Sequence, residues 1–327
     1  MIRPFDLTDL FLVHRLQRRG VWLDPHRALA GCEPPAWTAL SAPFRWWGGD
    51  VVTYVSREAA GGAIQMRLRP GRPEADIVFL APALAGDEES AALWRRLLAH
   101  CAQQAGEQGV QRLFASIPEE TPETLTLFRQ MGFSPYTREE VYGAEHPAGP
   151  AAAPGSHQVR PLTSADGWAL PKLHAAITPR LVQQAEGLGG SPEGDPSLPW
   201  SAAGHWERFV LEREGEIAGL VLVHPGRSAH CLRLWGDFQA TEEPLALLER
   251  GLAVLSAYPP RPVYCLVREY QSGVRTPLGE CGFRPVATWS RLVKHTVVRV
   301  REPARRALPA LEARAEPSVP GAVPTRR

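Results

Sequence analysis

The chain has 327 residues, of which 44% are hydrophobic and 22% charged, and its formal net charge is +1. This composition is typical of a soluble globular protein with room for two domains, and it provides no overall basic field for nucleic acid. No apolar run reaches membrane-spanning length, and the N-terminus carries charge where a signal peptide needs its apolar core. The five cysteines are scattered without a C-x-x-C pair, so we expect a reduced, cytoplasmic protein without a metal site.

The first half of the chain alternates short apolar strands with amphipathic helices. The expected elements are a helix over 8–19, a hairpin of 51–57 and 63–68, a strand over 75–80, a helix over 87–105 and a strand over 113–117. The segment 20–49 is long and rich in Trp, Phe, Pro and Gly. Thr121 is a plausible N-cap for a helix with Pro122 in its first position and Gly132 at its end. A strand over 137–142 follows.

The second half repeats this order. Ile2-Arg3-Pro4-Phe5 matches Val159-Arg160-Pro161-Leu162, and Met131-Gly132-Phe133 matches Cys281-Gly282-Phe283. A repeat as long as a domain indicates tandem duplication. The expected elements are a hairpin of 207–213 and 217–223, strands over 230–235 and 263–267, helices over 241–258 and 273–281, and a last strand over 292–299.

The repeat sets the predicted domain boundaries. The first domain is 1–144 and the second is 157–302, joined by a Pro-, Ala- and Gly-rich linker over 145–156. A disordered tail is predicted over 303–327, where Pro and Arg dominate.

The stretch from Leu113 to Tyr142 resembles the C-terminal half of a domain of the GNAT family of N-acetyltransferases. Its order is strand, helix, Gly-Phe, strand, and the positions that match the family's pattern are Ile117, Thr124, Leu127, Phe128, Gly132 and Phe133. The resemblance implies two tandem GNAT-like domains of the α/β (α+β) class. Each would hold a mixed, mostly antiparallel sheet flanked by helices, and the two would pack against each other.

The resemblance also implies acetyl-CoA as co-substrate, held by backbone N–H groups after the fourth strand. The contacts carried over to this chain are Leu80, Ala81, Gly86, Ser90 and Thr121. Small residues let a backbone approach phosphates, and only Gly86 suits that role in 85–90. The acidic residues Asp87, Glu88 and Glu89 would instead complement the helix dipole and repel a pyrophosphate. The matching segment 236–244 also lacks a glycine-rich cradle.

Candidate catalytic groups are few. Glu74, Asp76 and Glu119 lie at strand ends where a general base could act, and each could equally be a solvated carboxylate. The tyrosine that many family members place near the departing thiolate is replaced by Phe128, and by Leu278 in the second repeat; neither side chain can donate a proton.

Tryptophans gather in the region that covers the acceptor groove in the family. Trp22, Trp37, Trp46 and Trp47 could line a substrate groove or a subunit contact, or could close the edge of the core.

Two functions remain open at this point. The first is an atypical or weak N-acyltransferase that uses acetyl-CoA in the first domain and acts on a small amine, a protein N-terminus or a lysine. The second is a non-catalytic ligand- or partner-binding protein built from two degenerate GNAT domains. An open V between the fourth and fifth strands would favour the enzyme. The acceptor and the oligomeric state do not follow from the sequence.

Overall fold

A computed structural model describes residues 1–31, 33–41, 51–58, 61–147, 158–187 and 206–296. The described strands of the first half are β1 (Ile2–Pro4), β2 (Val21–Trp22), β3 (Val51–Ser56), β4 (Gly62–Leu68), β5 (Glu74–Ala81), β6 (Arg112–Pro118) and β7 (Ser134–Ala144). Its helices are η1 (Leu7–Asp9), α1 (Leu10–Leu16), α2 (Pro25–Ala30), α3 (Pro35–Ser41), α4 (Glu88–Glu107) and α5 (Pro122–Gln130).

The second half follows the same plan. Its described strands are β8 (Gln158–Pro161), β9 (Glu207–Arg213), β10 (Glu216–His224), β11 (His230–Gly236), β12 (Val263–Arg268) and β13 (Arg284–His295). Its helices are η3 (Ser164–Trp168), α6 (Ala169–Ile177), α7 (Arg180–Glu186), α8 (Glu242–Leu255), η5 (Ser272–Val274) and α9 (Arg275–Glu280). The predicted fold class, mostly antiparallel sheet flanked by helices in two repeats, is confirmed.

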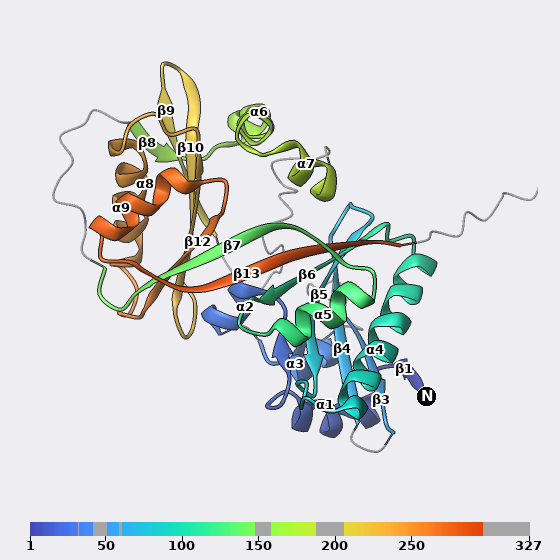
Figure 1. Ribbon diagram of the computed structural model, residues 1–327. Helices are drawn as coiled ribbons and strands as arrows, with labels where there is room; N and C mark the ends of the chain where they lie inside the picture. Colours follow the sequence, from blue (N-terminus) through green and yellow to red (C-terminus); the bar gives the residue numbers. More distant parts are fainter. Residues whose placement is uncertain (32, 42–50, 59–60, 148–157, 188–205, 297–327) are drawn as a thin grey trace, which may run out of the picture.

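All described strands belong to one 13-stranded sheet, in the order β1-β3-β4-β5-β6-β13-β7-β12-β11-β10-β9-β8, with β2 paired to β5. The two halves exchange their last strands at its centre (Figure 1). β13 lies between β6 and β7, with Val293 opposite Phe114, and β7 lies between β13 and β12, with Tyr142 opposite Cys265. Neither half therefore completes its sheet alone, although the boundary at 144 follows the sequence repeat.

Each half has its own apolar core on one face of the sheet. In the first half, Leu97 and Trp94 of α4 pack with Phe128 of α5 over Ile64 and Met66 of β4. In the second half, α8 and α9 cover the corresponding strands with a core that includes Leu247, Leu248, Leu278, Val221 and Val267. The apolar spacing on these helices accounts for their orientation, because each presents one stripe to the sheet.

Helices from each half also pack on strands of the other half. Ala30 of α2 contacts the cluster of Val141, Cys231 and Trp289. Ala185 of α7 contacts Phe114 and Val293. The region 20–49, to which the sequence assigned no helix or strand, contains β2, α2 and α3 among its described residues, and α2 links the two halves.

Three element boundaries differ from expectation. The helix expected over 8–19 is a short η1 followed by α1, which ends at Leu16. The last strand begins at Arg284, well before the expected 292, because it crosses the junction and pairs with β7 before it reaches β6. Register shifts at Pro285/Ala287 and Arg291/Leu292 interrupt the alternation of apolar and polar residues along β13. The sequence pattern therefore did not predict the first part of this strand. β7 likewise extends to Ser134–Ala144.

Candidate active site

The parallel strands β5 and β6 separate toward their C-terminal ends. They pair only from Glu74–Asp76 to Arg112–Phe114, and beyond Asp76 no described pairing joins them. The register of β5 against β4 also skips Val78, since Gln65 lies opposite Phe79 and Met66 opposite Ile77. This bulge directs the backbone of Val78 away from β4. The result is a V-shaped slot between β5 and β6.

A segment of the chain itself lies in this slot. β2 pairs antiparallel with β5, with Val21 opposite Leu80 and Trp22 opposite Phe79. Leu23 then bridges the two sides of the V: its N–H donates to the Val78 carbonyl at 2.9 Å, and its carbonyl accepts from the Ser116 N–H at 3.1 Å. The Leu23 side chain is 2% exposed and belongs to the main core. The slot has backbone groups on both walls, and the chain's own peptide uses them.

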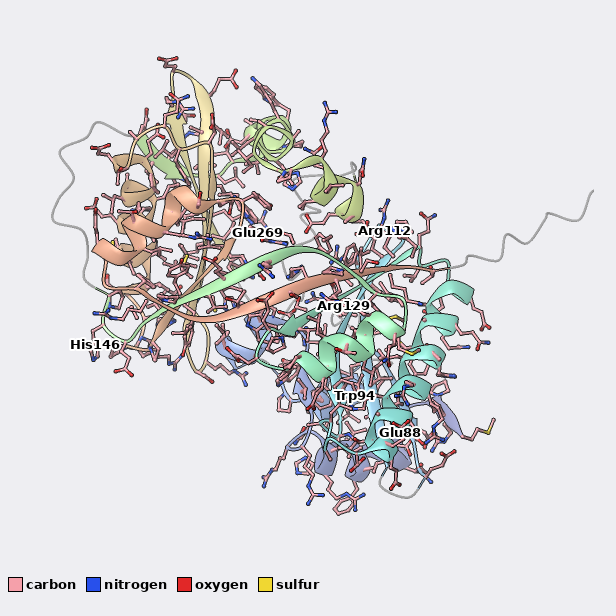
Figure 2. The ribbon with its side chains drawn as sticks, viewed as in Figure 1. Glu88, Trp94, Arg112, Arg129, His146 and Glu269 are labelled. Carbon is pink, nitrogen blue, oxygen red and sulfur yellow. The ribbon has the colours of Figure 1, made fainter. Side chains whose placement is uncertain are left out.

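A cleft of about 490 Å³ opens next to the slot, between the start of α4 and one side of α5. Gly86, in the loop before α4, adopts a left-handed φ of 79°, and no atom lies within 4 Å of the place that a Cβ would take, so a side chain there would point into open space. Glu88 marks the first turn of α4 (Figure 2). The cleft is lined by Leu84, Gly86, Asp87, Glu88, Ala91, Arg95, Pro122, Glu123, Thr126, Leu127 and Gln130.

The helix start beside this cleft is capped by its own residues. Asp87 is the N-cap of α4 and accepts from the Ser90 N–H at 2.7 Å, a hydrogen bond that lowers the pKa of Asp87. The Ser90 hydroxyl accepts from the Ala85 N–H at 3.2 Å. The cation that lines the cleft, Arg95, is paired with Glu88 at 2.6 Å. The cleft is therefore acidic, and the Ser90 N–H in the first turn of α4 already has a partner.

The start of α8 in the second half carries a buried carboxylate that bonds to the preceding loop. Glu243, at the start of α8, is 2% exposed and accepts from the Gln239 N–H at 2.8 Å. Arg213 pairs with its carboxylate at 3.0 Å. The ring of Phe238 lies against Gly236 and Gly219, where an added Cβ would approach within 2.4 Å and 2.9 Å of it. A carboxylate and an aromatic ring thus fill the space between the start of α8 and the strands beside it.

Glu74 and Asp76 lie in buried ion pairs. Asp76 accepts from Arg69 at 2.6 and 2.9 Å and from Arg67 at 3.2 Å. Burial acts to raise the pKa of Asp76, but the two arginines outweigh it and hold that pKa below its ordinary value. Glu74 is paired with Arg69, Arg72 and Arg112 at 3.0, 2.9 and 3.1 Å. Both carboxylates are thus surrounded by guanidinium groups, and those around Asp76 favour its ionised form.

Glu119 and Thr121 lie at the open end of β6. The Glu119 carboxylate accepts from the Ser290 hydroxyl at 2.7 Å and pairs with Arg138 at 2.8 Å, so it connects β6 to the exchanged strands. Thr121 occupies the N-cap of α5 without a side-chain cap bond, and its hydroxyl donates to the Pro118 carbonyl instead. Phe128 is fully buried against Trp94 and Phe133, so this position supplies no proton donor.

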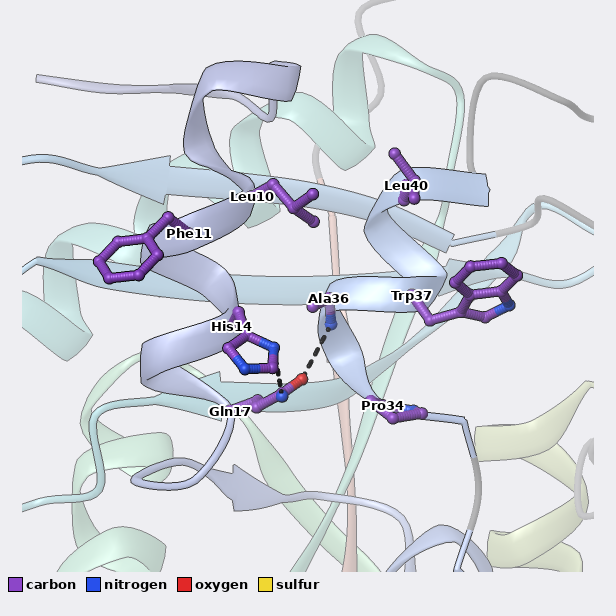
Figure 3. Close-up of a pocket in the computed structure, with 8 residues that line it drawn as sticks. All are labelled: Leu10, Phe11, His14, Gln17, Pro34, Ala36, Trp37 and Leu40. Atoms are coloured by element: carbon purple, nitrogen blue, oxygen red, sulfur yellow. Dashed lines mark hydrogen bonds between the residues drawn. The ribbon is translucent and has the colours of Figure 1, made fainter.

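Two of the four tryptophans predicted to line a groove, Trp22 and Trp37, belong to the described residues, and they lie in different places. Trp22 packs edge-on against Phe79 at 5.2 Å, in the core under α1. Trp37 is 55% exposed and lines an apolar groove of about 450 Å³ between α1 and α3, opposite Phe11, which is 78% exposed (Figure 3). His14 and Gln17 lie at one end of it, joined at 3.0 Å. Trp46 and Trp47 lie outside the described residues.

The junction of the two halves contains a buried charge cluster that the sequence did not reveal. Glu139 of β7 is 1% exposed and lies 3.2 Å from Arg291 and 3.5 Å from both Arg233 and Arg268. Arg268 also pairs with Glu186 of α7 at 3.0 Å. The sequence does show charged residues inside the predicted strands. Such residues can equally face solvent, so their burial could not be predicted without knowing which strands pair.

Two further kinds of site are absent from the described ranges. No described helix is long and apolar enough to cross a membrane. Among the described side chains, no group of three or more His, Cys, Asp and Glu could hold a metal ion.

Comparison with known proteins identifies the fold. No family model matches this chain, and no curated protein matches it by sequence. A GCN5-related N-acetyltransferase from Sphaerobacter thermophilus is similar in structure, with a TM-score of 0.56 and 16% identity over 90% of this chain and 95% of that chain. A tandem GNAT protein from the clavulanic acid biosynthesis pathway has a TM-score of 0.57 and 15% identity over 90% of this chain and 98% of its own. The chain therefore has the tandem GNAT fold that its sequence motifs predicted.

Proposed function

We propose that this protein is an atypical N-acyltransferase that uses acetyl-CoA as its acyl donor in the slot between β5 and β6. The GNAT fold supports acyl transfer as the general class of activity. The observation that carries the proposal is the V between these strands, whose walls present the backbone of Val78, Leu80 and Ser116 to an extended chain. The pantetheine arm of CoA is an extended chain with two amides, so groups that pair with a peptide there can pair with it.

In this proposal, the backbone of β5 positions and polarises the thioester. The Leu80 N–H would face the carbonyl oxygen on which negative charge develops when an amine attacks. The amine forms the new C–N bond, the C–S bond breaks, and CoA leaves as a thiolate. Among the described candidates, Asp76 and Glu74 are held in ion pairs and Phe128 is apolar, so we assign the proton to none of these three. The reaction would then depend on the positioning of the amine and the thioester, and solvent would carry the protons. We therefore expect slow turnover.

The acceptor class remains that expected from the resemblance: a small-molecule amine, a protein N-terminus or a lysine. The apolar groove that contains Trp37 lies on the α1–α3 side of the first half, on the sheet face opposite α4. An acceptor with an apolar or aromatic body would gain contact area there.

A specific observation favours a second candidate function, that of a non-catalytic binding protein. The start of α4 is capped by Asp87, which accepts from the Ser90 N–H, and the start of α8 carries the buried carboxylate of Glu243, which accepts from the Gln239 N–H of the preceding loop. An anionic cofactor must compete with Asp87 for the Ser90 N–H, and Glu243 would repel it at α8.

Acetyl-CoA binding to the full-length protein, measured by calorimetry, tests the proposal. We expect one-to-one binding that Gly86→Glu weakens at least about tenfold, because Gly86 lines the cleft and the new carboxylate adds negative charge there. Gly71→Glu is the matched control: Gly71 also has a left-handed φ, of 70°, and open space around its Cβ position, but it does not line the cleft. Equal effects of the two variants on acetyl-CoA binding would argue against the cleft as the binding site. Acyl transfer to a panel of amines is measured for the variants that bind.

A further inference from the structure

The segment in the slot is continuous with a helix that is anchored on the other half of the protein. β2 runs through Leu23 into Asp24, which caps α2 by accepting from the His26 N–H at 3.0 Å. Asp24 also lies 3.7 Å from Arg67 of β4. Two residues thus separate the strand that fills the slot from the first turn of α2, and a displacement of one is transmitted to the other.

α2 is held by the second half at both ends. Near its start, the ring of His26 meets that of His224 at the end of β10, with Nε2 and Nδ1 3.1 Å apart. At its end, the Ala30 carbonyl accepts from the N–H groups of Arg227 and Ser228 at 3.1 and 3.2 Å. Its last residue packs against β11, β7 and β13. The second half therefore fixes the position of the segment that closes the first.

We infer that Gly20–Leu23 is an autoinhibitory segment, which we call the lock, that occupies the acyl-CoA slot. The second half of the chain holds the lock in the slot through α2. The inference rests on the proposed acyl-CoA function of the slot. Acetyl-CoA and the lock use the same backbone groups of β5, so each excludes the other. When Gly20–Leu23 withdraws from the slot, the Leu23 side chain leaves the core, and the pantetheine arm of acetyl-CoA occupies the space that it vacates. The second repeat thereby acquires a role that does not require a cofactor site of its own.

Gly20 offers a direct way to open the lock. A Cβ at this position would lie 2.2 Å from Phe79 Cζ and 2.8 Å from Ala81 Cβ, so Gly20→Ala cannot keep the segment against β5. Gly273→Ala is the matched control, because Gly273 has no atom within 4 Å of its Cβ position and no positive φ.

A second variant loosens the anchor at a distance from the slot. Gly31, the residue after α2, has a φ of 67°, and a Cβ there would lie 2.0 Å from Ser228 Oγ. Gly31→Val adds both backbone strain and this clash, so the end of α2 must leave the second half. Gly71→Val reproduces the strain at a φ of 70° with open space around the Cβ position, and serves as its control.

The experiment titrates the full-length wild type and the four variants with acetyl-CoA, and follows amide hydrogen exchange of the peptides that cover 19–24 and 76–83. We expect Gly20→Ala and Gly31→Val to bind at least about tenfold more tightly than wild type and to exchange faster over 19–24, with both controls unchanged. Tight binding that is equal in wild type and variants would overturn the lock and leave the proposed function standing. Absence of binding in every folded variant would overturn both, and would favour the non-catalytic function.

Discussion

Glu139 illustrates how a single side chain can depend on both halves of the protein. It belongs to β7, while its three arginine neighbours come from β11, β12 and β13. Burial acts to raise the pKa of Glu139, but Arg233, Arg291 and Arg268 outweigh it and lower that pKa to about 2. The carboxylate is thus ionised at every ordinary pH and offsets part of the positive charge of the three arginines.

Replacing this carboxylate leaves buried guanidinium groups without compensation. We expect Glu139→Gln to reduce the free energy of unfolding by roughly 3–5 kcal/mol, measured by urea titration at pH 7. Glu120→Gln, at an exposed position at the end of β6, is the control and should change stability little. Because the pKa of Glu139 is lowered in the folded protein, the carboxylate contributes stability above pH 4.5 that is lost as the pH falls toward 2. The free energy of unfolding of Glu139→Gln should therefore fall less than that of wild type over this pH range. An unchanged unfolding midpoint would show that the cluster contributes no net stability.

At the scale of elements, α2 matters more than its length suggests. It has only the six residues Pro25–Ala30, yet it connects β2 in the slot of the first half to β10 and β11 of the second. Its docking includes the ring contact of His26 with His224, and Trp206 lies 5.0 Å from both imidazoles. Burial lowers the pKa of His26 to about 3 and that of His224 to about 4, so both imidazoles are neutral when α2 is docked.

These two histidines predict a loss of stability in mild acid. Between pH 6.5 and about pH 4 the unfolded chain binds protons that the folded protein excludes, so the free energy of unfolding falls as the pH falls. Each imidazole contributes a slope of about 1.4 kcal/mol per pH unit over that range. Urea titrations at pH 7, 6 and 5 should show this slope, and His224→Phe should reduce it by about half. His14→Asn, at an exposed position on α1, should leave it intact; an equal slope in the His224 variant would contradict the assignment.

At the scale of the whole molecule, the exchange of β7 and β13 makes one folding unit of two repeats. Each exchanged strand has both of its sheet neighbours in the other half or in the other exchanged strand. A fragment that ends at residue 144 lacks β13, which belongs between β6 and β7. The predicted domains 1–144 and 157–302 are thus repeats of the sequence, which does not imply that either of them folds alone.

This topology predicts that the halves do not fold separately. We expect the fragment 1–144 to be unfolded or aggregated because one edge of β6, both edges of β7 and the apolar face of β7 lose their partners. Full-length protein should unfold in a single transition by circular dichroism and by tryptophan fluorescence alike. A monomeric 1–144 fragment with a cooperative transition, or two separate transitions in the full chain, would show that the exchange is dispensable.

The sequence alone determined the tandem repeat, the order of most of its strands and helices, and the GNAT fold. These features rest on local signals: apolar periodicity, the helix ends at Gly132 and Gly282, and a hairpin such as that of β9 and β10, each set by residues close in the chain. The acidic start of α4 was also readable, because a helix cap involves neighbours only. Only the tertiary structure decided which strands pair at the junction, that Val21–Leu23 fills the slot, and that Asp76 and Glu139 are ion-paired. The physical reason is that a strand's sheet partner and a side chain's burial depend on residues far along the chain, which no local pattern encodes.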